Sequence, residues 1–381
     1  MAGGKKNQPI VVAQIMGKWV GGGVEAVIMN YYRHIDRNKV QFDFICDEDS
    51  TNIPYEEIEK LGGHVILCPP YQKLFKYMKF LENLFREKKY RIVHSNINTL
   101  SVFPLRAAKK AGVKVRIAHS HSVIKSSKAE PMRSAFKLLL RKCSKKNATL
   151  YFACSKEAGV SQFGRRAFKN NEVRVINNVI EPKEYKYCQR WRQEIRKKYN
   201  IKTDDIVFGM VGRMVTTKNP TYAVERFAEY YGHHKNAVFL FVGDGPELKK
   251  IKKIACKGGY ENRLIFAGQV TDVSPFYSAM DILLFPSLYE GFGMALVEAQ
   301  YSGLPCVASS IVPRTTKITD RVRYLDVRSS RAWDETIKSY LETITEKVRR
   351  KNAINIKGYD VATEVEKLEK VYKSFCYECG N

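Results

Sequence analysis

Residues 282–309, ILLFPSLYEGFGMALVEAQYSGLPCVAS, contain the pattern that best indicates the fold class. It begins with an apolar run that ends at Pro286 and Ser287 and has the length and composition of a buried strand. A glycine turn then opens a helical pattern near Met294, and a second strand-like run, PCVAS, follows the helix. Two strands joined through one helix form a βαβ unit, which predicts a parallel sheet covered on both faces.

The same alternation recurs along both halves of the chain. Strand-length runs such as PIVVAQIM and RIVHS in the first half, and IVFGMVG and AVFLFVG in the second, are separated by amphipathic patterns such as residues 24–35. Two such series without hairpin signals predict an α/β protein of two doubly wound, Rossmann-like domains. We place these domains at 1–185 and 186–360. A C-terminal helix and tail, 361–381, either closes the second domain or packs back across the first.

The charge of the chain indicates an anionic partner. The 381 residues carry a formal net charge of +26, and residues 1–185 hold 33 Lys and Arg against 16 Asp and Glu. Such an excess is typical of proteins that meet a nucleotide, a nucleic acid or an anionic membrane surface, although a basic surface alone also explains it. The start lacks the pattern of a signal peptide, and no apolar run is long enough to span a bilayer, so we expect a cytoplasmic protein.

Two motifs raise the question of a metal, and we expect none. Cys376 and Cys379 form a CxxC at the C-terminus without a second pair, so we interpret it as a frayed tail, and the nine cysteines as reduced thiols. Asp47 and Asp49 follow the second strand as an Asp-x-Asp pair without accompanying signature, and we interpret them as an acidic loop. If they held a metal on donor phosphates, a chelator would abolish activity.

Two basic residues follow the first strand of the second half. Arg213 and Lys218 lie in GRMVTTKNP, between that strand and a helix that begins near Pro220. An arginine fork and a lysine charge beside the free amides of a helix start suit a pyrophosphate. The alternative is a solvated basic loop. Because ligands bind beyond the carboxyl ends of parallel strands, the position favours the phosphate site.

Glycines mark the ends of the neighbouring strands. A glycine lets the backbone approach a ligand closely, but Gly-Asp-Gly-Pro is also an ordinary turn, so each glycine alone is a weak signal. The glycines at these strand ends are Gly212, Gly243, Gly245 and Gly268.

Glu290 and Glu298 flank the glycine turn 291–293. The amides of Gly293 to Leu296 would be unpaired donors at the helix start, where a diphosphate can bind. One carboxylate lies before the turn and the other along the helix, so each can accept hydrogen bonds from hydroxyls on one side of the phosphate. A nucleoside-diphosphate sugar has hydroxyls on both sides. There are two alternatives. One is the pair of catalytic carboxylates of a glycosidase, which would need no basic phosphate site beside it, and the other is a surface helix with solvent-exposed glutamates.

As a set, these motifs resemble the retaining glycosyltransferases of family 4. The matching segments are GR…K at 212–218, VGDGPE at 242–247 and EGFGMALVE at 290–298. Two glutamates with seven residues between them and an internal Phe-Gly are the mark of that family. The first half is most similar to transferases of bacterial capsule and exopolysaccharide assembly, through RIVHSNINTLSVFPLRAAKKAGVKVRIAHSHS at 91–122.

The resemblance implies a GT-B fold, in which two Rossmann-like domains face one cleft, with the donor nucleotide sugar on the second domain and the acceptor on the first. It also implies transfer with retained anomeric configuration, without metal or cofactor. By position, Arg213 and Lys218 would hold the diphosphate, Glu290 the hexose and Glu298 the ribose. The expected donor-binding residues are Gly22, Gly23, Gly212, Arg213, Lys218, Gly243, Gly245, Gly268, Glu290, Gly291, Phe292, Gly293, Met294, Leu296 and Glu298.

A glycine-rich loop follows the first strand in GKWVGGGVEAVIMN. Gly21, Gly23 and Ala26 fit a loose dinucleotide-binding fingerprint, which raises a dehydrogenase. That fingerprint needs its first glycine directly after the strand, and here the strand ends near Met16. The resembled family has a Gly-Gly pair in this loop near the donor phosphate and the acceptor, and Gly22 and Gly23 match it.

His119 and His121 follow the strand VRIA and, as alternate residues, share one face. The resemblance places a histidine at this strand end, near the transferred sugar, with His121 the first choice and His119 the second. A structural histidine and a metal pair lacking its third ligand are the alternatives. The expected catalytic residues are therefore His121, His119, Glu290, Arg213 and Lys218.

Basic and aromatic residues interleave in two segments of the first half, 71–91 and 122–146. Phe136, Leu138 to Leu140 and the surrounding lysines and arginines predict a helix that can lie on an anionic membrane with its apolar face down. A core helix with a solvated basic face is the alternative. We favour peripheral contact with the inner face of the cell membrane, because a lipid-linked acceptor would require it.

Together with these patterns, the resemblance implies a retaining, metal-independent hexosyltransferase. It would move a hexose or N-acetylhexosamine from a nucleotide sugar, UDP-linked in preference to GDP-linked, to a glycan or lipid-linked acceptor of surface polysaccharide. One alternative is a sugar-nucleotide epimerase on a similar scaffold. The other is a basic nucleic-acid-binding protein, but no nucleic-acid module is recognisable and we expect no nucleic acid as a partner.

Overall fold

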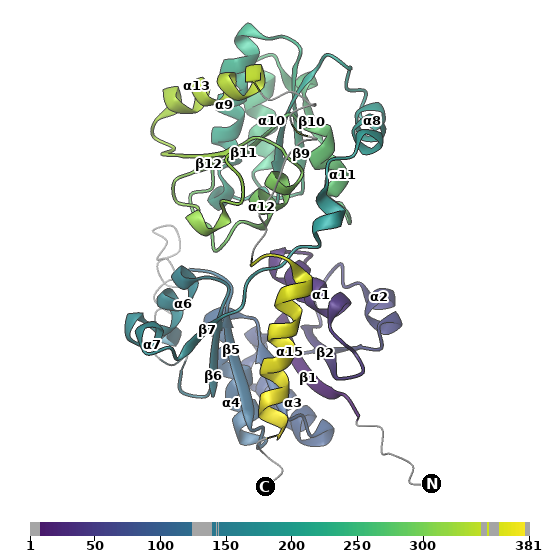
Figure 1. The fold of residues 1–381 in the computed structure, drawn as a ribbon, viewed down its shortest axis with the longest axis vertical. Helices are drawn as coiled ribbons and strands as arrows, with labels where there is room; N and C mark the ends of the chain where they lie inside the picture. The colour runs from purple at the N-terminus through teal and green to yellow at the C-terminus, as the bar shows by residue number, and fades with distance from the viewer. Residues whose placement is uncertain are drawn as a thin grey trace. The chain divides into compact units, whose positions relative to one another are not determined.

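The computed structural model describes residues 8–123, 139–141, 143, 145–343, 349 and 358–377. It divides into two compact units: unit 1 is Met1–Ile180 with Gly358–Asn381, and unit 2 is Glu181–Lys357 (Figure 1). The sequence-predicted division lay at 185/186 and 360/361, whereas the chain passes between the units at 180/181 and 357/358.

Unit 1 is built on one parallel sheet of seven strands, in the order β3-β2-β1-β4-β5-β6-β7. The strand residues are almost continuously apolar and buried, as expected for strands covered on both faces. The strands are β1 (Ile10–Gly17), β2 (Val40–Asp47), β3 (His64–Cys68), β4 (Ile92–Ser95), β5 (Val115–Ser120), β6 (Leu150–Ala153) and β7 (Val173–Val175). The helices are α1 (Gly23–His34), α2 (Tyr55–Lys60), α3 (Leu74–Lys88), α4 (Val102–Lys110), α6 (Lys156–Phe163), α7 (Arg165–Lys169) and α15 (Val361–Tyr377).

The C-terminal helix α15 belongs to unit 1, which decides between the two alternatives that the sequence left open. It packs against α1 and β1, where Figure 1 shows it in yellow. Val365, Leu368 and Tyr372 are buried at intervals of three and four, so one face of the helix joins the core. The Ile180 amide donates to the Tyr359 carbonyl at 3.1 Å, which ties the segment before α15 to the end of unit 1.

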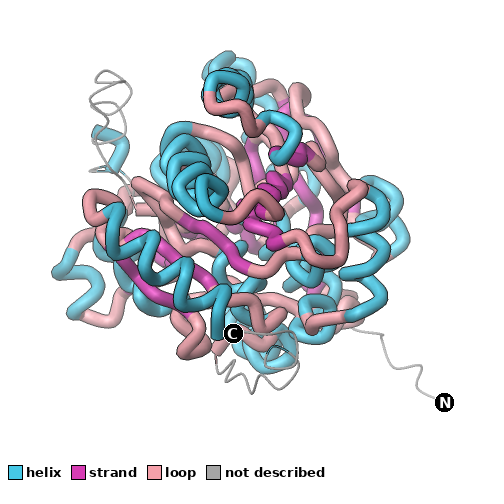
Figure 2. Tube along the Cα trace, turned by 90° about the horizontal axis from the view of Figure 1, so that it is seen from above, coloured by secondary structure: helices cyan, strands magenta, loops and turns pink. Residues whose placement is uncertain are grey.

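Unit 2 is built on a parallel sheet of six strands, in the order β10-β9-β8-β11-β12-β13. Helices flank the strands, as cyan and magenta tubes show in Figure 2. The strands are β8 (Ile206–Val211), β9 (Ala237–Val242), β10 (Leu264–Phe266), β11 (Ile282–Phe285), β12 (Cys306–Ser309) and β13 (Val322–Leu325). The helices are α8 (Gln189–Lys198), α9 (Pro220–His233), α10 (Leu248–Lys257), α11 (Ser274–Ala279), α12 (Met294–Tyr301) and α13 (Ser330–Thr343).

The prediction of two doubly wound parallel sheets is confirmed, and the two strand orders locate the places where a ligand can bind. In unit 2 the chain runs from β8 outward through β9 and β10, then returns to the other side of β8 with β11. In unit 1 the corresponding reversal lies between β1 and β4. Loops diverge at such a reversal and leave a crevice beyond the carboxyl ends of the two strands.

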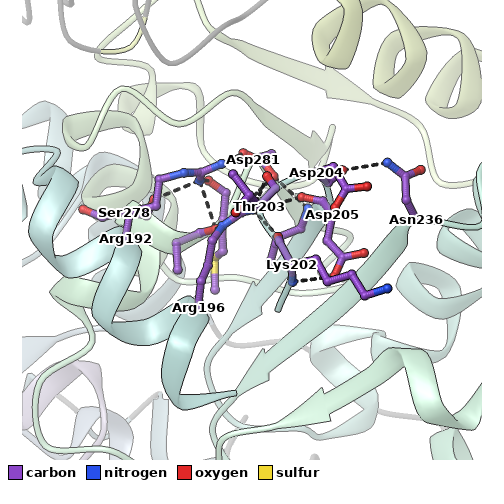
Figure 3. Close-up of polar contacts among 12 residues, drawn as sticks. Arg192, Arg196, Lys202, Thr203, Asp204, Asp205, Asn236, Ser278 and Asp281 are labelled. Carbon is purple, nitrogen blue, oxygen red and sulfur yellow. Dashed lines mark hydrogen bonds and ion pairs between the residues drawn. The ribbon is translucent and has the colours of Figure 1, made fainter. Parts of the chain in front are cut away.

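A charged cluster fixes α8 to the sheet of unit 2 (Figure 3). The Asp281 carboxylate accepts hydrogen bonds from Arg192 and Arg196, both at 2.7 Å, and from the Val207 amide at 2.8 Å. Arg196 also donates to the Asp205 carbonyl at 3.0 Å. The cluster joins the first helix of the unit to the loop before β11 and to the start of β8, so it orients the central strands.

Within the described parts of the chain, no helix is both long and apolar enough to cross a membrane. Most of the predicted membrane segment at 122–146, including Phe136 and Leu138, lies outside the described residues, as does Cys379 of the CxxC motif. Leu139 is described and is exposed, whereas Leu140 is buried.

Candidate active site

The first feature of the candidate site is an ion pair between two neighbouring strand ends. Lys218 lies in a short 3₁₀ turn after β8, and Glu290 lies in the loop after β11. Their side chains form a salt bridge, and the Ser287 hydroxyl donates to the same carboxylate oxygen of Glu290 at 3.2 Å. The Lys218 ammonium also lies 5.2 Å from the centre of the Phe285 ring. The pair therefore stands at the reversal of the unit 2 sheet.

Backbone hydrogen bonds join the loops beyond four strands into one surface. The Met214 amide donates to the Asp244 carbonyl at 2.8 Å, and the Gly243 amide donates to the Gly268 carbonyl at 2.7 Å. The Leu288 amide donates to the Thr217 carbonyl at 2.8 Å, which links the β11 loop to the β8 loop. These bonds fix the loops before any ligand arrives.

The glycine at position 243 has a structural reason within unit 2. Its φ is +125°, and a Cβ atom there would lie 2.1 Å from the Gly212 carbonyl oxygen. No side chain fits such a contact, so this position needs glycine to let the β8 and β9 loops meet. A similar contact with the Met214 carbonyl holds for Gly245. The sequence analysis considered a close approach to a ligand and an ordinary turn as reasons for these glycines. The packing of the loops is by itself a sufficient reason for both.

Helix α12 begins at Met294, and its N-cap residue, Gly293, has a left-handed conformation with φ +103°. The amides of Gly293, Met294 and Ala295 have no carbonyl partner within the described parts of the chain. The amide of Leu296, however, donates to the Gly293 carbonyl at 3.0 Å. The expectation that the free donors extend to Leu296 is therefore wrong, because the first helical bond uses that amide. Three free amides remain beside Glu290.

Glu298 lies on α12 and is held by a neighbouring helix. It is 8% exposed, and the Tyr277 hydroxyl of α11 donates to its carboxylate at 2.7 Å. Burial raises the pKa of Glu298 to about 7, while the Tyr277 hydrogen bond partly lowers it and the nearby Glu184 charge raises it. A buried carboxylate with one donor retains acceptor capacity for hydroxyl groups of a ligand.

Arg213 occupies the loop after β8, as predicted, and its side chain is exposed. Its guanidinium has no hydrogen-bond or ion-pair partner in the described ranges, unlike Lys218. Gly212 precedes it with φ +130° and nothing within 4 Å of a Cβ atom built there. The arginine is therefore free to bind an anion at this strand end.

In unit 1, the glycine-rich loop after β1 leads into α1. Gly22 is the N-cap of the helix and Gly23 its first residue. The Glu25 carboxylate accepts a hydrogen bond from the Val20 amide at 3.2 Å, which fixes the loop against the first helical turn. The loop lies at the β1 end, where the unit 1 sheet reverses.

His119 and His121 are both buried at the end of β5, with ring centres 3.9 Å apart. The ring of His119 also faces His94 of β4, with Nε2 of His94 3.0 Å from Nδ1 of His119. His121 Nε2 contacts the side-chain oxygen of Asn96 at 3.0 Å. Burial lowers the pKa of His94 and of His121 to about 3 and that of His119 well below its usual value, so all three rings are neutral.

The acidic loop after β2 is divided between two environments. Asp49 pairs with Lys18 at 2.7 Å, whereas Asp47 is buried next to Cys68, and burial raises its pKa to about 6. No group of three His, Cys, Asp or Glu side chains in the described ranges lies close enough together to hold a metal ion.

Two family models match the two halves of the chain. The model described as Glycosyltransferase Family 4 matches residues 21–184, and the model described as Glycosyl transferases group 1 matches residues 192–357. The chain belongs to the family 4 glycosyltransferases. Between them the two matches include the glycine loop, the histidines and every candidate residue of unit 2.

Proteins of similar sequence align with almost the whole length of this transferase. It is 28% identical to the putative glycosyltransferase EpsF of Bacillus subtilis, covering 92% of this chain and 93% of that protein. It is 25% identical to the Escherichia coli UDP-Gal:alpha-D-GlcNAc-diphosphoundecaprenol alpha-1,3-galactosyltransferase, covering 96% and 97%. The capsular polysaccharide biosynthesis glycosyltransferase CapH of Staphylococcus aureus is 24% identical, covering 96% and 99%.

Solved structures show the same fold. HepE of Anabaena, in complex with UDP and glucose, superposes with a TM-score of 0.79 at 19% identity, covering 95% of this chain and 99% of that one. WaaG, a glycosyltransferase involved in lipopolysaccharide biosynthesis, superposes with a TM-score of 0.70 at 18% identity, covering 97% and 100%. The GT-B architecture that the resemblance implied is therefore confirmed.

The predicted site residues of the transferase form two groups, one in each unit. Unit 2 brings Arg213, Lys218 and Glu290 to adjacent strand ends, with Glu298 on the helix that follows. Unit 1 holds the glycine loop and the histidines. The sequence analysis missed the partners that hold these groups, chiefly Tyr277 beside Glu298 and Asn96 beside His121. Each partner lies far in sequence from the residue that it contacts. For Asn96 there was one signal in the sequence, because it is a polar residue directly after the apolar run of β4.

Proposed function

We propose that this glycosyltransferase moves a hexose or N-acetylhexosamine from a UDP-linked sugar to a glycan or lipid-linked acceptor, with retention of the anomeric configuration and without a metal. The observation that carries the proposal is the Lys218–Glu290 pair at the sheet reversal, beside the free amides of α12. A sugar diphosphate needs a cation and free N–H groups for its phosphates and a hydrogen-bond acceptor for its sugar hydroxyls, and all three lie at this strand end.

In this proposal the diphosphate binds against the amides of Gly293 to Ala295, with Arg213 and Lys218 neutralising its charge. Glu290 accepts from hexose hydroxyls and Glu298 from ribose hydroxyls. Without donor, Glu290 is the charge partner of Lys218. The diphosphate would then take over that role and release the carboxylate for the sugar.

The proposed step is a front-face substitution. The bond between the anomeric carbon and the leaving phosphate oxygen breaks, and a bond from that carbon to the acceptor oxygen forms on the same face. The acceptor proton passes to the leaving phosphate oxygen. Arg213, Lys218 and the α12 amides stabilise the charge that develops there. The step needs no side-chain nucleophile.

Surface polysaccharide is the proposed product, and UDP the proposed carrier. The S. aureus relative CapH is named for capsular polysaccharide biosynthesis, and the E. coli relative is named for a UDP sugar and a diphosphoundecaprenol acceptor. A lipid-linked acceptor fits peripheral membrane contact. Phe75 on α3 is 83% exposed and Leu74 40% exposed, next to the exposed Lys76.

The test is a panel of UDP- and GDP-sugars, each incubated with and without a polyprenyl-pyrophosphate sugar acceptor. We expect one UDP-sugar to be consumed with acceptor, in EDTA as well as without it, and an α-linked product from an α-linked donor by NMR. Product of inverted configuration, or loss of activity with EDTA, would contradict the mechanism. Conversion of the sugar without any acceptor would identify an epimerase instead.

A further inference from the structure

An unbroken chain of side-chain hydrogen bonds joins the C-terminal helix to the histidines of unit 1. His121 Nε2 contacts Asn96 Oδ1 at 3.0 Å, and Asn96 Nδ2 donates to Gln14 Oε1 at 2.9 Å. Gln14 Nε2 donates to the Tyr372 hydroxyl oxygen at 3.1 Å. From that hydroxyl the chain continues to His94 Nδ1 at 2.7 Å, and His94 Nε2 lies 3.0 Å from His119 Nδ1. All six side chains are buried.

The amides give this chain a direction. Because Asn96 Oδ1 can only accept, His121 must carry its proton on Nε2, which leaves Nδ1 as a lone pair. The Tyr372 oxygen accepts from Gln14 and donates its own proton to His94 Nδ1. His94 then carries its proton on Nε2 and donates to His119 Nδ1, so the proton of His119 is on Nε2. Each neutral ring has one proton, and every bond in the chain has one donor and one acceptor.

The two ends of the chain are left without partners. His121 Nδ1, an acceptor, and His119 Nε2, a donor, are both buried and make no hydrogen bond to any described residue. Their rings lie 3.9 Å apart at the end of β5. A hydroxyl group donates one hydrogen bond and accepts others, so it can satisfy a lone pair and an N–H together. Buried polar groups without a partner are costly, which favours a ligand with this chemistry.

We propose that Tyr372 is a positioning residue of the acceptor site: through this chain, it fixes the tautomers of His119 and His121 so that they present one donor and one acceptor to a sugar hydroxyl. The inference rests on the proposed function, because the hydroxyl is that of the sugar acceptor. Helix α15 then has a role in turnover besides covering β1. The low pKa values that burial gives the three rings keep them neutral, as the chain requires.

Tyr372→Phe tests the proposal, because it removes one hydroxyl and keeps the ring that packs edge-on against Phe42. Without it, Gln14 loses its acceptor and His94 its donor, so both arms of the chain can reverse. Tyr77→Phe is the matched control: Tyr77 is equally buried in unit 1, and its hydroxyl has no partner among the described residues. Gln14→Met, of similar length, interrupts the arm toward His121 in a second way.

The measurements are the ¹⁵N chemical shifts of the histidine rings, kcat, and the Kd of the UDP-sugar found in the panel. For Tyr372→Phe and Gln14→Met we expect mixed ring tautomers and a kcat lower by about three- to tenfold, with an unchanged donor Kd. Tyr77→Phe should match wild type in all three. Unchanged tautomers in Tyr372→Phe, or a kcat equal to that of Tyr77→Phe, would overturn the inference.

The proposed function and this inference fail in different ways. If wild type binds and transfers no nucleotide sugar, the proposed function is wrong, and the ¹⁵N spectra still report whether Tyr372 fixes the tautomers. If wild type is active and the tautomers change without any fall in kcat, the chain exists but does not serve the reaction. Circular dichroism melting of each variant separates a loss of fold from both results.

Discussion

Lys218 and Glu290 are 72 positions apart, follow different strands, and form an ion pair at the point where the unit 2 sheet reverses. The side chains are 23% and 12% exposed, so the pair is partly desolvated. Two opposite charges at this partly buried strand end have one of two roles. They stabilise the fold, or they bind a ligand that separates them. These two roles predict different outcomes when the charges are removed one at a time and together.

Lys218→Met should weaken binding of the UDP-sugar by about tenfold, because a charge-assisted contact to phosphate is lost. Isothermal titration calorimetry measures it, and Lys252→Met is the control, since Lys252 also lies over an aromatic ring, 4.9 Å from the centre of Phe266. The double variant Lys218→Met/Glu290→Gln decides the role of the pair. If it regains wild-type affinity, Lys218 serves only to neutralise Glu290.

Glu290→Ala should lower turnover more than donor affinity. The glutamate contacts the hexose in the proposed site, where a correctly placed sugar matters most in the transition state. Steady-state kinetics against the donor give kcat and KM separately. A variant with wild-type kcat and a raised KM would show that Glu290 binds the ground state only, and wild-type values of both would remove it from the site.

Glu298→Gln should lower the affinity for the sugar nucleotide and raise the free energy of unfolding. Between pH 4.5 and about 7, the folded protein keeps a proton on Glu298 that the unfolded chain has lost, so burial makes the free energy of unfolding fall as pH rises through this window. The neutral glutamine avoids this penalty. At pH 8 we expect the variant to gain on the order of 2 kcal/mol in urea unfolding.

The same carboxyl predicts how donor binding depends on pH. Ribose hydroxyls are donors to the ionised form, so the affinity for UDP-glucose should increase from pH 6 to pH 8 in the wild type and stay flat in Glu298→Gln. UDP-glucose is the suitable probe because its diphosphate has no group that titrates in this range. Equal pH profiles for the two proteins would exclude Glu298 from the binding site.

Much of the fold could be predicted because strands buried on both faces appear as continuous apolar runs. β8 and β9 are such runs, and the helix at Met294 begins where its glycine turn indicated. β13 was missed because it is an edge strand, where Arg323 and Tyr324 interrupt the apolar pattern. Short edge strands are less buried, so their sequences are less continuously apolar and harder to identify as strands.

The site could be predicted only as a set of strand ends. Charged residues after β8 and β11 pointed to a ligand, but the sequence does not contain the strand order, so it could not show that Lys218 meets Glu290. The chain through Tyr372 was beyond reach for the same reason, because Gln14 and Tyr372 are 358 positions apart. The position of a residue in a motif predicts its functional role, whereas the tertiary packing determines which side chain it contacts.

Asp281→Asn should destabilise unit 2 by about 2–4 kcal/mol, because two arginines would lose their carboxylate. Arg196 is only 7% exposed and cannot turn to water without leaving the core. Thermal and urea unfolding measure the loss. Asp204→Asn, at an exposed side chain a few residues before β8, should lie within about 0.5 kcal/mol of wild type. Equal stability of the two variants would mean that the cluster contributes little.

Phe75→Ser should reduce binding of the transferase to anionic vesicles, because the ring of Phe75 on α3 is the most exposed large hydrophobic side chain among the described residues. Loss of its burial in lipid costs about 2 kcal/mol, or roughly thirtyfold in the partition coefficient. Sedimentation with vesicles of phosphatidylglycerol and phosphatidylcholine measures it, with Tyr55→Ser as the control, since Tyr55 is 43% exposed on α2. If both variants bind like wild type at low and physiological salt, α3 does not contact the membrane, and the basic residues of unit 1 serve another partner.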